Sequence, residues 1–136
     1  MTKAIPHIQK YMSTSPHSVG PEQTLATAHS MMREHHIRHL PVLHGGKLVG
    51  MLTERDVALI ASMQGASEKI TTVEDAMSSD VYSVTPDAPL DEVAAEMAEK
   101  KYGSTVVLQN GKIVGMFTTT DVCRALSELL HERLAK

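Results

Sequence analysis

Cysteine is almost absent from this chain, which has one, Cys123, among its 136 residues. A single cysteine cannot form an internal disulfide, so the fold must rest on its hydrophobic core. No general base stands beside Cys123 in the sequence, and we interpret it as a packing residue. A chain without disulfides suits a reducing compartment, which predicts a cytoplasmic protein.

Long apolar runs and an excess of positive charge are also missing. The N-terminal stretch lacks the apolar segment of a signal peptide, and no run approaches the roughly 18 residues that cross a bilayer. The formal net charge of −3 gives no basic surface for a phosphate backbone. Aromatic residues make up only 3% of the chain, so nine methionines help to fill the core. We therefore expect one globular body with neither a membrane nor a nucleic-acid partner.

Motifs that carry catalysis or bind metals are missing too. The chain has no phosphate-loop Gly-Lys-Ser/Thr and no Gly-x-Gly-x-x-Gly after a strand. His35, His36 and His39 suggest a metal cluster at first sight. A helix that ends near His36 would separate His35 from His39, and no cysteine or carboxylate completes a ligand set. The sequence predicts neither an enzyme nor a metal site.

What the chain does contain is an internal repeat. At a constant offset of 65, residues 12–57 align with residues 77–122 without a gap, and 18 of the 46 pairs are identical. Such self-similarity indicates duplication of one structural unit. A unit of about 60 residues buries little surface alone, so we expect two copies to pack about a pseudo-two-fold axis. The predicted first repeat spans residues 8–62, a polar linker 63–73, and the second repeat 74–134.

Each copy predicts the same elements. A short extended segment ends at a proline, an amphipathic helix follows, and a glycine turn then joins two strands before a second helix. The first copy predicts extended segments at 17–19, 40–43 and 47–53, with a final helix from Glu54. The second predicts them at 82–84, 105–108 and 112–118, with a final helix from Thr119 towards Leu134.

Two stretches of the first copy carry a resemblance to a known family. IRHLPV at Ile37–Val42 and GMLTERDV at Gly50–Val57, with GMFTTTDV at Gly115–Val122 in the second copy, resemble the cystathionine-β-synthase (CBS) domain. Two in tandem resemble a CBS pair, also called a Bateman module. The resemblance implies an α/β fold of two β-α-β-β-α repeats and adenosyl ligands in the clefts between them. It also implies a homodimer of two pairs in a disc and a regulatory role toward a protein partner that the sequence does not identify.

The Thr-x-x-Asp motifs are the principal candidate ligand residues: Thr53 with Asp56, and Thr118 with Asp121. Each begins a helix, where free amides and a positive dipole end suit a phosphate. In the family the aspartate takes the ribose hydroxyls, and an ionised carboxylate is an acceptor suited to both. The alternative is a capping box, in which the motif only caps the start of the helix. The two roles can coexist if the ligand displaces the cap.

The copies differ at the entry to their first hairpin strand. Ile37, Arg38 and His39 stand in the first copy, where the two basic residues, with Arg55, suit a phosphate. Tyr102, Gly103 and Ser104 stand in the second, where the tyrosine can lie against a base. Arg38 as a solvated charge and Tyr102 as packing are the alternatives. We therefore expect two unequal sites, at least one with a phosphorylated ligand.

The resemblance also assigns backbone contacts with adenine to the segments after Met12 and Met77, namely Thr14, Ser15 and Pro16, and Ser79, Asp80 and Val81. The leading hypothesis is a sensor of an adenosyl ligand such as AMP, ADP, ATP, S-adenosylmethionine or NAD, bound with or without magnesium. The resemblance implies that the role of such a sensor includes energy sensing. The alternative is a structural dimerisation module with degenerate sites, whose long last helix supplies the interface.

Overall fold

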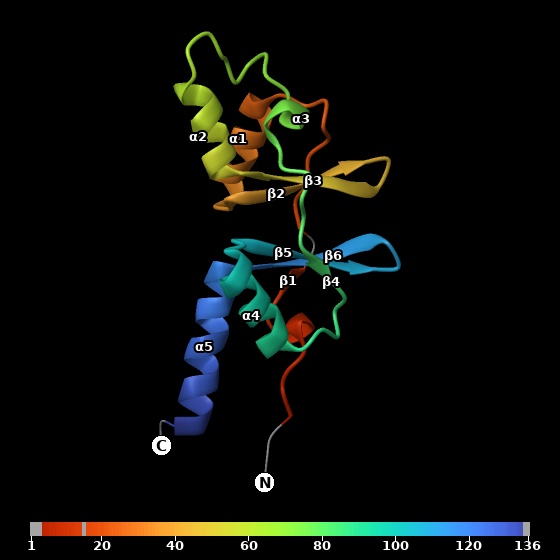
Figure 1. The fold of residues 1–136 in the computed structure, drawn as a ribbon, viewed down its shortest axis with the longest axis vertical. Coiled ribbons are helices and arrows are strands. Elements are labelled where there is room, and N and C mark those ends of the chain that lie inside the picture. The colour runs from red at the N-terminus through yellow and green to blue at the C-terminus, as the bar shows by residue number, and fades with distance from the viewer. Residues whose placement is uncertain (1–3, 15, 135–136) are drawn as a thin grey trace. The chain divides into compact units, whose positions relative to one another are not determined.

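The computed structural model describes residues 4–14 and 16–134. The chain forms two compact units (Figure 1). We call residues 17–81 the central unit, and residues 1–16 with 82–136 the terminal unit, because the latter holds both ends of the chain. Each unit is described by itself.

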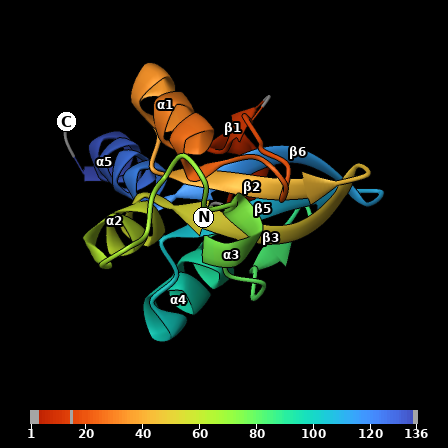
Figure 2. The ribbon, with the colours of Figure 1, turned by 90° about the horizontal axis from the view of Figure 1, so that it is seen from above.

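The central unit is a hairpin covered by two helices. Its elements are α1 (Leu25–His35), β2 (His39–His44), β3 (Lys47–Thr53), α2 (Glu54–Ser62) and α3 (Val73–Ala76). β2 and β3 pair antiparallel through a Gly45-Gly46 turn, which has positive φ at both residues and lies on the side away from α1 and α2 (Figure 2). Val19 adds a parallel bridge to Val42, and Ser78 an antiparallel bridge to Met51.

The terminal unit repeats this plan with longer outer strands. It contains η1 (Ile8–Lys10), β1 (Ser13–Thr14), β4 (Ser83–Val84), α4 (Leu90–Lys100), β5 (Ser104–Gln109), β6 (Lys112–Thr118) and α5 (Thr119–Leu134). Its sheet has the order β1-β6-β5-β4, with β4 parallel to β5 and the other pairs antiparallel. The predicted α/β fold of two repeated units is therefore confirmed.

The two units exchange their first segments relative to the sequence repeat. β1, at the start of the first copy, pairs with β6 of the second copy, while Ser78 at the start of the second copy pairs with Met51 of the first. The contacts thus divide the chain differently from the predicted boundaries 8–62 and 74–134, which describe the repeat in sequence. Short polar segments of this kind carry no periodicity that predicts a distant pairing partner.

A glycine in each hairpin makes this exchanged pairing possible. A Cβ at Gly50 would lie 2.8 Å from the Ser78 carbonyl oxygen, and one at Gly115 would lie 2.9 Å from that of Ser13. Met77 and Met12 crowd the same two glycines with their sulfur atoms. Gly50 and Gly115, which are equivalent in the two copies, therefore mark the place where the exchanged segment crosses each hairpin.

The predicted linker, residues 63–73, is packed against α1. The carbonyls of Thr71 and Glu68 accept hydrogen bonds from the amides of Leu25 and Ala26, and His29 lies 2.8 Å from the Glu68 carboxylate. These contacts satisfy amide groups that the start of a helix otherwise leaves unpaired.

Each unit has its own apolar core beneath its helices. The predicted helix positions Leu25, Ala28 and Met32 are buried in the central unit, as are Leu90, Val93 and Met97 in the terminal unit. Met32 and Met97 are among these buried residues, which confirms that methionine helps to fill the core. Within the described residues, no helix is long and apolar enough to span a bilayer.

The predicted packing role of Cys123 is wrong, because its side chain is exposed on α5. The inward positions of this helix are taken by Asp121 and Ala125, which are four residues apart and both buried. Cys123 lies between them in sequence and therefore faces away from the core.

Candidate functional site

The first Thr-x-x-Asp motif joins β3 to α2 and forms a complete capping box. The Thr53 hydroxyl accepts a hydrogen bond from the Asp56 amide at 3.1 Å, and the Asp56 carboxylate accepts one from the Thr53 amide at 2.9 Å. The predicted cap is thus present. The cap uses Oδ2 of Asp56, whose side chain is half-buried. Oδ1 accepts no hydrogen bond from the described residues.

Arg38 and His39 lie beside this motif. His39 pairs with Thr53 across the hairpin, and the Arg38 carbonyl accepts the first amide of α2, from Glu54, at 2.9 Å. Burial, assisted by the charge of Arg38, lowers the pKa of His39 against the opposing effect of Asp56 and Glu54. His39 is therefore favoured in its neutral form, and Arg38 supplies the positive charge.

A pocket of about 320 Å³ opens at this junction in the central unit. Ile37 and Arg38 line it, and so do Arg33 and His36, which sequence reasoning did not assign to a ligand. His36 ends α1 in the left-handed conformation with φ 54°, and this brings the last turn of α1 to the pocket. Basic residues in the last turn of a helix were the available signal, but they are common as partners of the helix dipole. Met32 and Glu54 complete the lining.

Arg55 does not join this group. It is exposed on the first turn of α2, and among the described residues it is not part of the pocket lining. The structure thus brings Ile37 and Arg38 to the pocket and pairs His39 with Thr53 beside it. Like Arg55, the residues His39, Thr53 and Asp56 are not among the described residues that line the pocket.

The second Thr-x-x-Asp motif, between β6 and α5, has a different arrangement. Oδ2 of Asp121 accepts hydrogen bonds from the Thr118 amide at 2.9 Å and the Thr118 hydroxyl at 3.2 Å. Oδ1 accepts one from Arg124 at 2.8 Å. The Asp121 side chain is only 5% exposed, while that of Arg124 is 57% exposed. Both carboxylate oxygens of this motif are therefore occupied from within the chain.

Tyr102, Gly103 and Ser104 adjoin the second motif. Ser104 pairs with Thr118, and the Gly103 carbonyl accepts the Thr119 amide at 3.2 Å. The Tyr102 ring stacks on Tyr82 with centroids 5.1 Å apart and packs against the core of the terminal unit. The packing alternative for Tyr102 is therefore present in the structure.

The segments assigned to adenine are divided between the units. Thr14 pairs with Gly115 and lies, with the half-buried Pro16, in the terminal unit. Ser15 lies outside the described residues. Ser79, Asp80 and Val81 follow the bridge from Ser78 to Met51 in the central unit. Because of the exchange, each segment accompanies the motif of the other copy.

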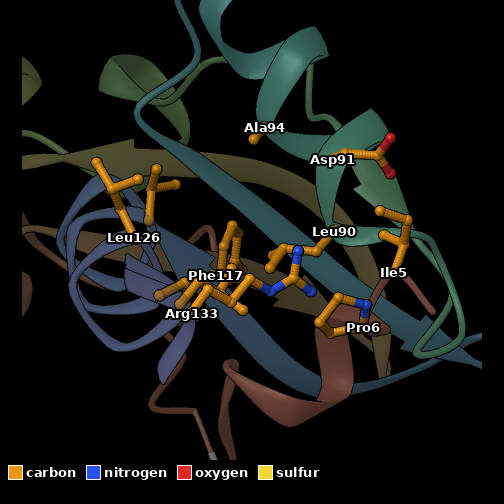
Figure 3. Close-up of a pocket in the computed structure, with 11 residues that line it drawn as sticks. Ile5, Pro6, Leu90, Asp91, Ala94, Phe117, Leu126 and Arg133 are labelled. Atoms are coloured by element: carbon orange, nitrogen blue, oxygen red, sulfur yellow. The ribbon is translucent and has the colours of Figure 1, made fainter. Parts of the chain in front are cut away.

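An apolar groove of about 240 Å³ lies between α4, α5 and the N-terminal segment of the terminal unit. Figure 3 shows Phe117, Leu126 and Arg133 toward one side, and Ile5, Pro6 and Leu90 toward the other. Exposed leucines follow α5 from the groove, where Leu126 is 56% exposed, to Leu130 at 48% and Leu134 at 73%. Among residues 4–14 and 16–134, no cluster of His, Cys, Asp and Glu could hold a metal ion.

Comparison with known proteins identifies two CBS domains that together cover most of the chain. The CBS domain family model matches residues 8–62 and 73–128. The CBS domain-containing protein YhcV of Bacillus subtilis is 30% identical over 125 residues, which cover 92% of this chain and 87% of that protein. A solved CBS domain pair in complex with 5′-methylthioadenosine and S-adenosyl-L-methionine is 26% identical, with a TM-score of 0.84 over 93% of this chain and 99% of that one.

An enzyme also matches, but only through part of its length. Inosine-5′-monophosphate dehydrogenase of Korarchaeum cryptofilum is 34% identical over 123 residues, which cover 90% of this chain but 25% of the enzyme. CBS pair proteins are regulatory ligand-binding modules. This chain belongs to the CBS domain family, with two CBS domains in tandem.

Proposed function

We propose that this protein is a regulatory module that binds an adenosyl ligand at its Thr-x-x-Asp motifs and has no catalytic activity of its own. The observation that carries the proposal is the first motif, where one carboxylate oxygen of Asp56 has no partner among the described residues. The neighbouring Glu54 lines a pocket with Arg33 and Arg38. A carboxylate oxygen accepts ribose hydroxyls, and guanidinium groups bind phosphate.

The phosphorylated members of the ligand class fit the central unit best. Arg33 and Arg38 outnumber the single acidic lining residue, Glu54, so the pocket favours an anion. AMP, ADP, ATP and NAD satisfy this condition, with or without magnesium. S-adenosylmethionine carries the same ribose, and one CBS pair of similar fold was solved with it. We place the module in the cytoplasm, where these ligands signal the energy state of the cell.

Thermal unfolding with AMP, ADP, ATP, S-adenosylmethionine and NAD, and with GMP as control, tests this proposal. A ligand at 100 times its Kd adds about 2.7 kcal/mol, which raises the melting temperature of a domain of this size by several degrees. A shift with an adenosyl ligand and none with GMP supports the sensor. The absence of any shift would reduce both motifs to helix caps.

A second role, homodimerisation, is favoured by the apolar face of α5. Exposed leucines beside a groove form the kind of surface that monomers rarely leave open. We propose that a second copy of this chain covers it, and that the dimer reports ligand binding to a regulated protein. Light scattering should give the mass of a dimer, and Leu130→Glu should give a monomer. A wild-type chain that stays monomeric at high concentration would contradict this role.

A further inference from the structure

Arg124 is the residue that makes the two Thr-x-x-Asp motifs unequal. Its guanidinium donates to Oδ1 of Asp121 at 2.8 Å, and the two residues are one helical turn apart on α5. At the offset of 65, the equivalent residue in the central unit is Leu59, which is 61% exposed and has no polar group to offer Asp56. The difference is therefore built into one position of the repeat.

The contact occupies the atom that a ribose would need. Thr118 already donates twice to Oδ2 of Asp121, and Arg124 takes Oδ1, so a ligand hydroxyl must compete with a charged donor. At Asp56, among the residues that the structure describes, the Thr53 amide on Oδ2 is the one donor to the carboxylate. A charge-assisted hydrogen bond is stronger than a neutral one, so its displacement reduces the affinity for the ligand.

We infer that Arg124 is an internal latch that holds the second motif closed, so that the first motif binds an adenosyl ligand more tightly than the second. This inference rests on the proposed function. Arg124 is a positioning residue that sets the affinity of Asp121, and the chain fills its motifs in order. The protein thus responds over two ranges of ligand concentration.

The latch predicts opposite effects of one variant on stability and on binding. Arg124→Leu copies the residue of the central unit and removes the contact. Measured in an Asp56→Ala background, which leaves the second motif alone, it should bind AMP about 5-fold more tightly, as expected for loss of a competing ion pair whose arginine is largely exposed. The same variant should melt at a slightly lower temperature, because it loses a stabilising contact. A purely structural role would lower stability without any gain in affinity.

The reciprocal variant is the matched control. Leu59→Arg places a guanidinium three residues after Asp56, the spacing of Arg124 from Asp121. In an Asp121→Ala background it should weaken AMP binding by a similar factor. Isothermal titration with AMP and with S-adenosylmethionine measures both effects, and the second compound shows whether they follow the shared ribose.

The outcomes separate the latch from the function on which it rests. If neither compound binds the wild-type chain, the proposed function fails and the latch fails with it. If the compounds bind but Arg124→Leu leaves the affinity unchanged, the latch alone is wrong. Weaker binding by Arg124→Leu would also overturn it, because Arg124 would then be holding the ligand.

Discussion

The central and terminal units share one backbone plan but differ in the chemistry at the same place. In both units a Thr-x-x-Asp motif lies where the second strand of the hairpin ends and a helix begins. In the central unit His39 pairs with Thr53 of the motif, and a pocket lined by Arg38 and Glu54 opens next to it. The terminal unit has Gly103 and Ser104 there, and Arg124 on its aspartate. The two copies thus share the Thr-x-x-Asp residues that start the helix, while the positions around the two motifs differ.

The largest expected effect tests whether both units depend on the same crossing of segments. Gly50→Ala and Gly115→Ala each place a methyl group against a backbone carbonyl, which cannot move as a flexible side chain can. Each should lower the free energy of unfolding by up to about 3 kcal/mol, measured by urea denaturation. Ser13→Ala, at an exposed position, is the control. A cost at only one glycine would break the equivalence of the units.

The next effect contrasts the two aspartates in the absence of ligand. Asp121→Ala leaves Thr118 and Arg124 without their acceptor and should cost about 2 kcal/mol. Asp56→Ala removes one capping interaction and should cost about 1 kcal/mol. Equal losses in the same denaturation assay would contradict the difference in their hydrogen bonding.

A buried hydroxyl distinguishes the cores. Thr105 is fully buried, and its hydroxyl has no hydrogen-bond partner in the described part of the chain, whereas the equivalent residue of the central unit is Leu40. Thr105→Val should therefore stabilise the protein by about 1 kcal/mol. Leu40→Thr should do the opposite and destabilise it. Loss of stability in Thr105→Val would show that the hydroxyl has a partner.

The smallest effect concerns pH and is confined to the central unit. Burial lowers the pKa of His39 from its ordinary value of 6.5, so the unfolded chain binds a proton more readily than the folded one. The stability contributed by neutral His39 is present above pH 6.5 and is lost as the pH falls from there through the lowered folded pKa. In thermal melts, His39→Gln should flatten the dependence of stability on pH. Ser104→Asn, at the equivalent position of the terminal unit, should leave that dependence unchanged. An unchanged slope in His39→Gln would contradict the burial of its neutral form.

The sequence predicted the hairpins and the helix ends closely. Strands Lys47–Thr53 and Lys112–Thr118 have the predicted bounds, because a glycine turn and a capping threonine mark their two ends. The predicted end of α1 near His36 is also confirmed, and that residue adopts the left-handed conformation. Local signals of this kind need no knowledge of the tertiary fold.

The exchanged segments and the latch could not be predicted in the same way. β1 has two residues and pairs with a strand about a hundred positions later, so its partner depends on the packing of the whole unit. The pair of Asp121 and Arg124 has a spacing that occurs on many helix surfaces. The burial of Asp121 and the contrast with Leu59, which the structure shows, are what distinguish this contact from an ordinary surface pair.

The most direct test of this account is the titration of Asp56→Ala and Asp121→Ala with the adenosyl ligand that gives the largest thermal shift. Isothermal titration of the wild-type chain should show a tighter and a weaker site. Asp56→Ala should lose the tighter site and Asp121→Ala the weaker one, with both variants folded by circular dichroism. Unchanged binding in both variants would contradict the account and leave the two motifs as helix caps.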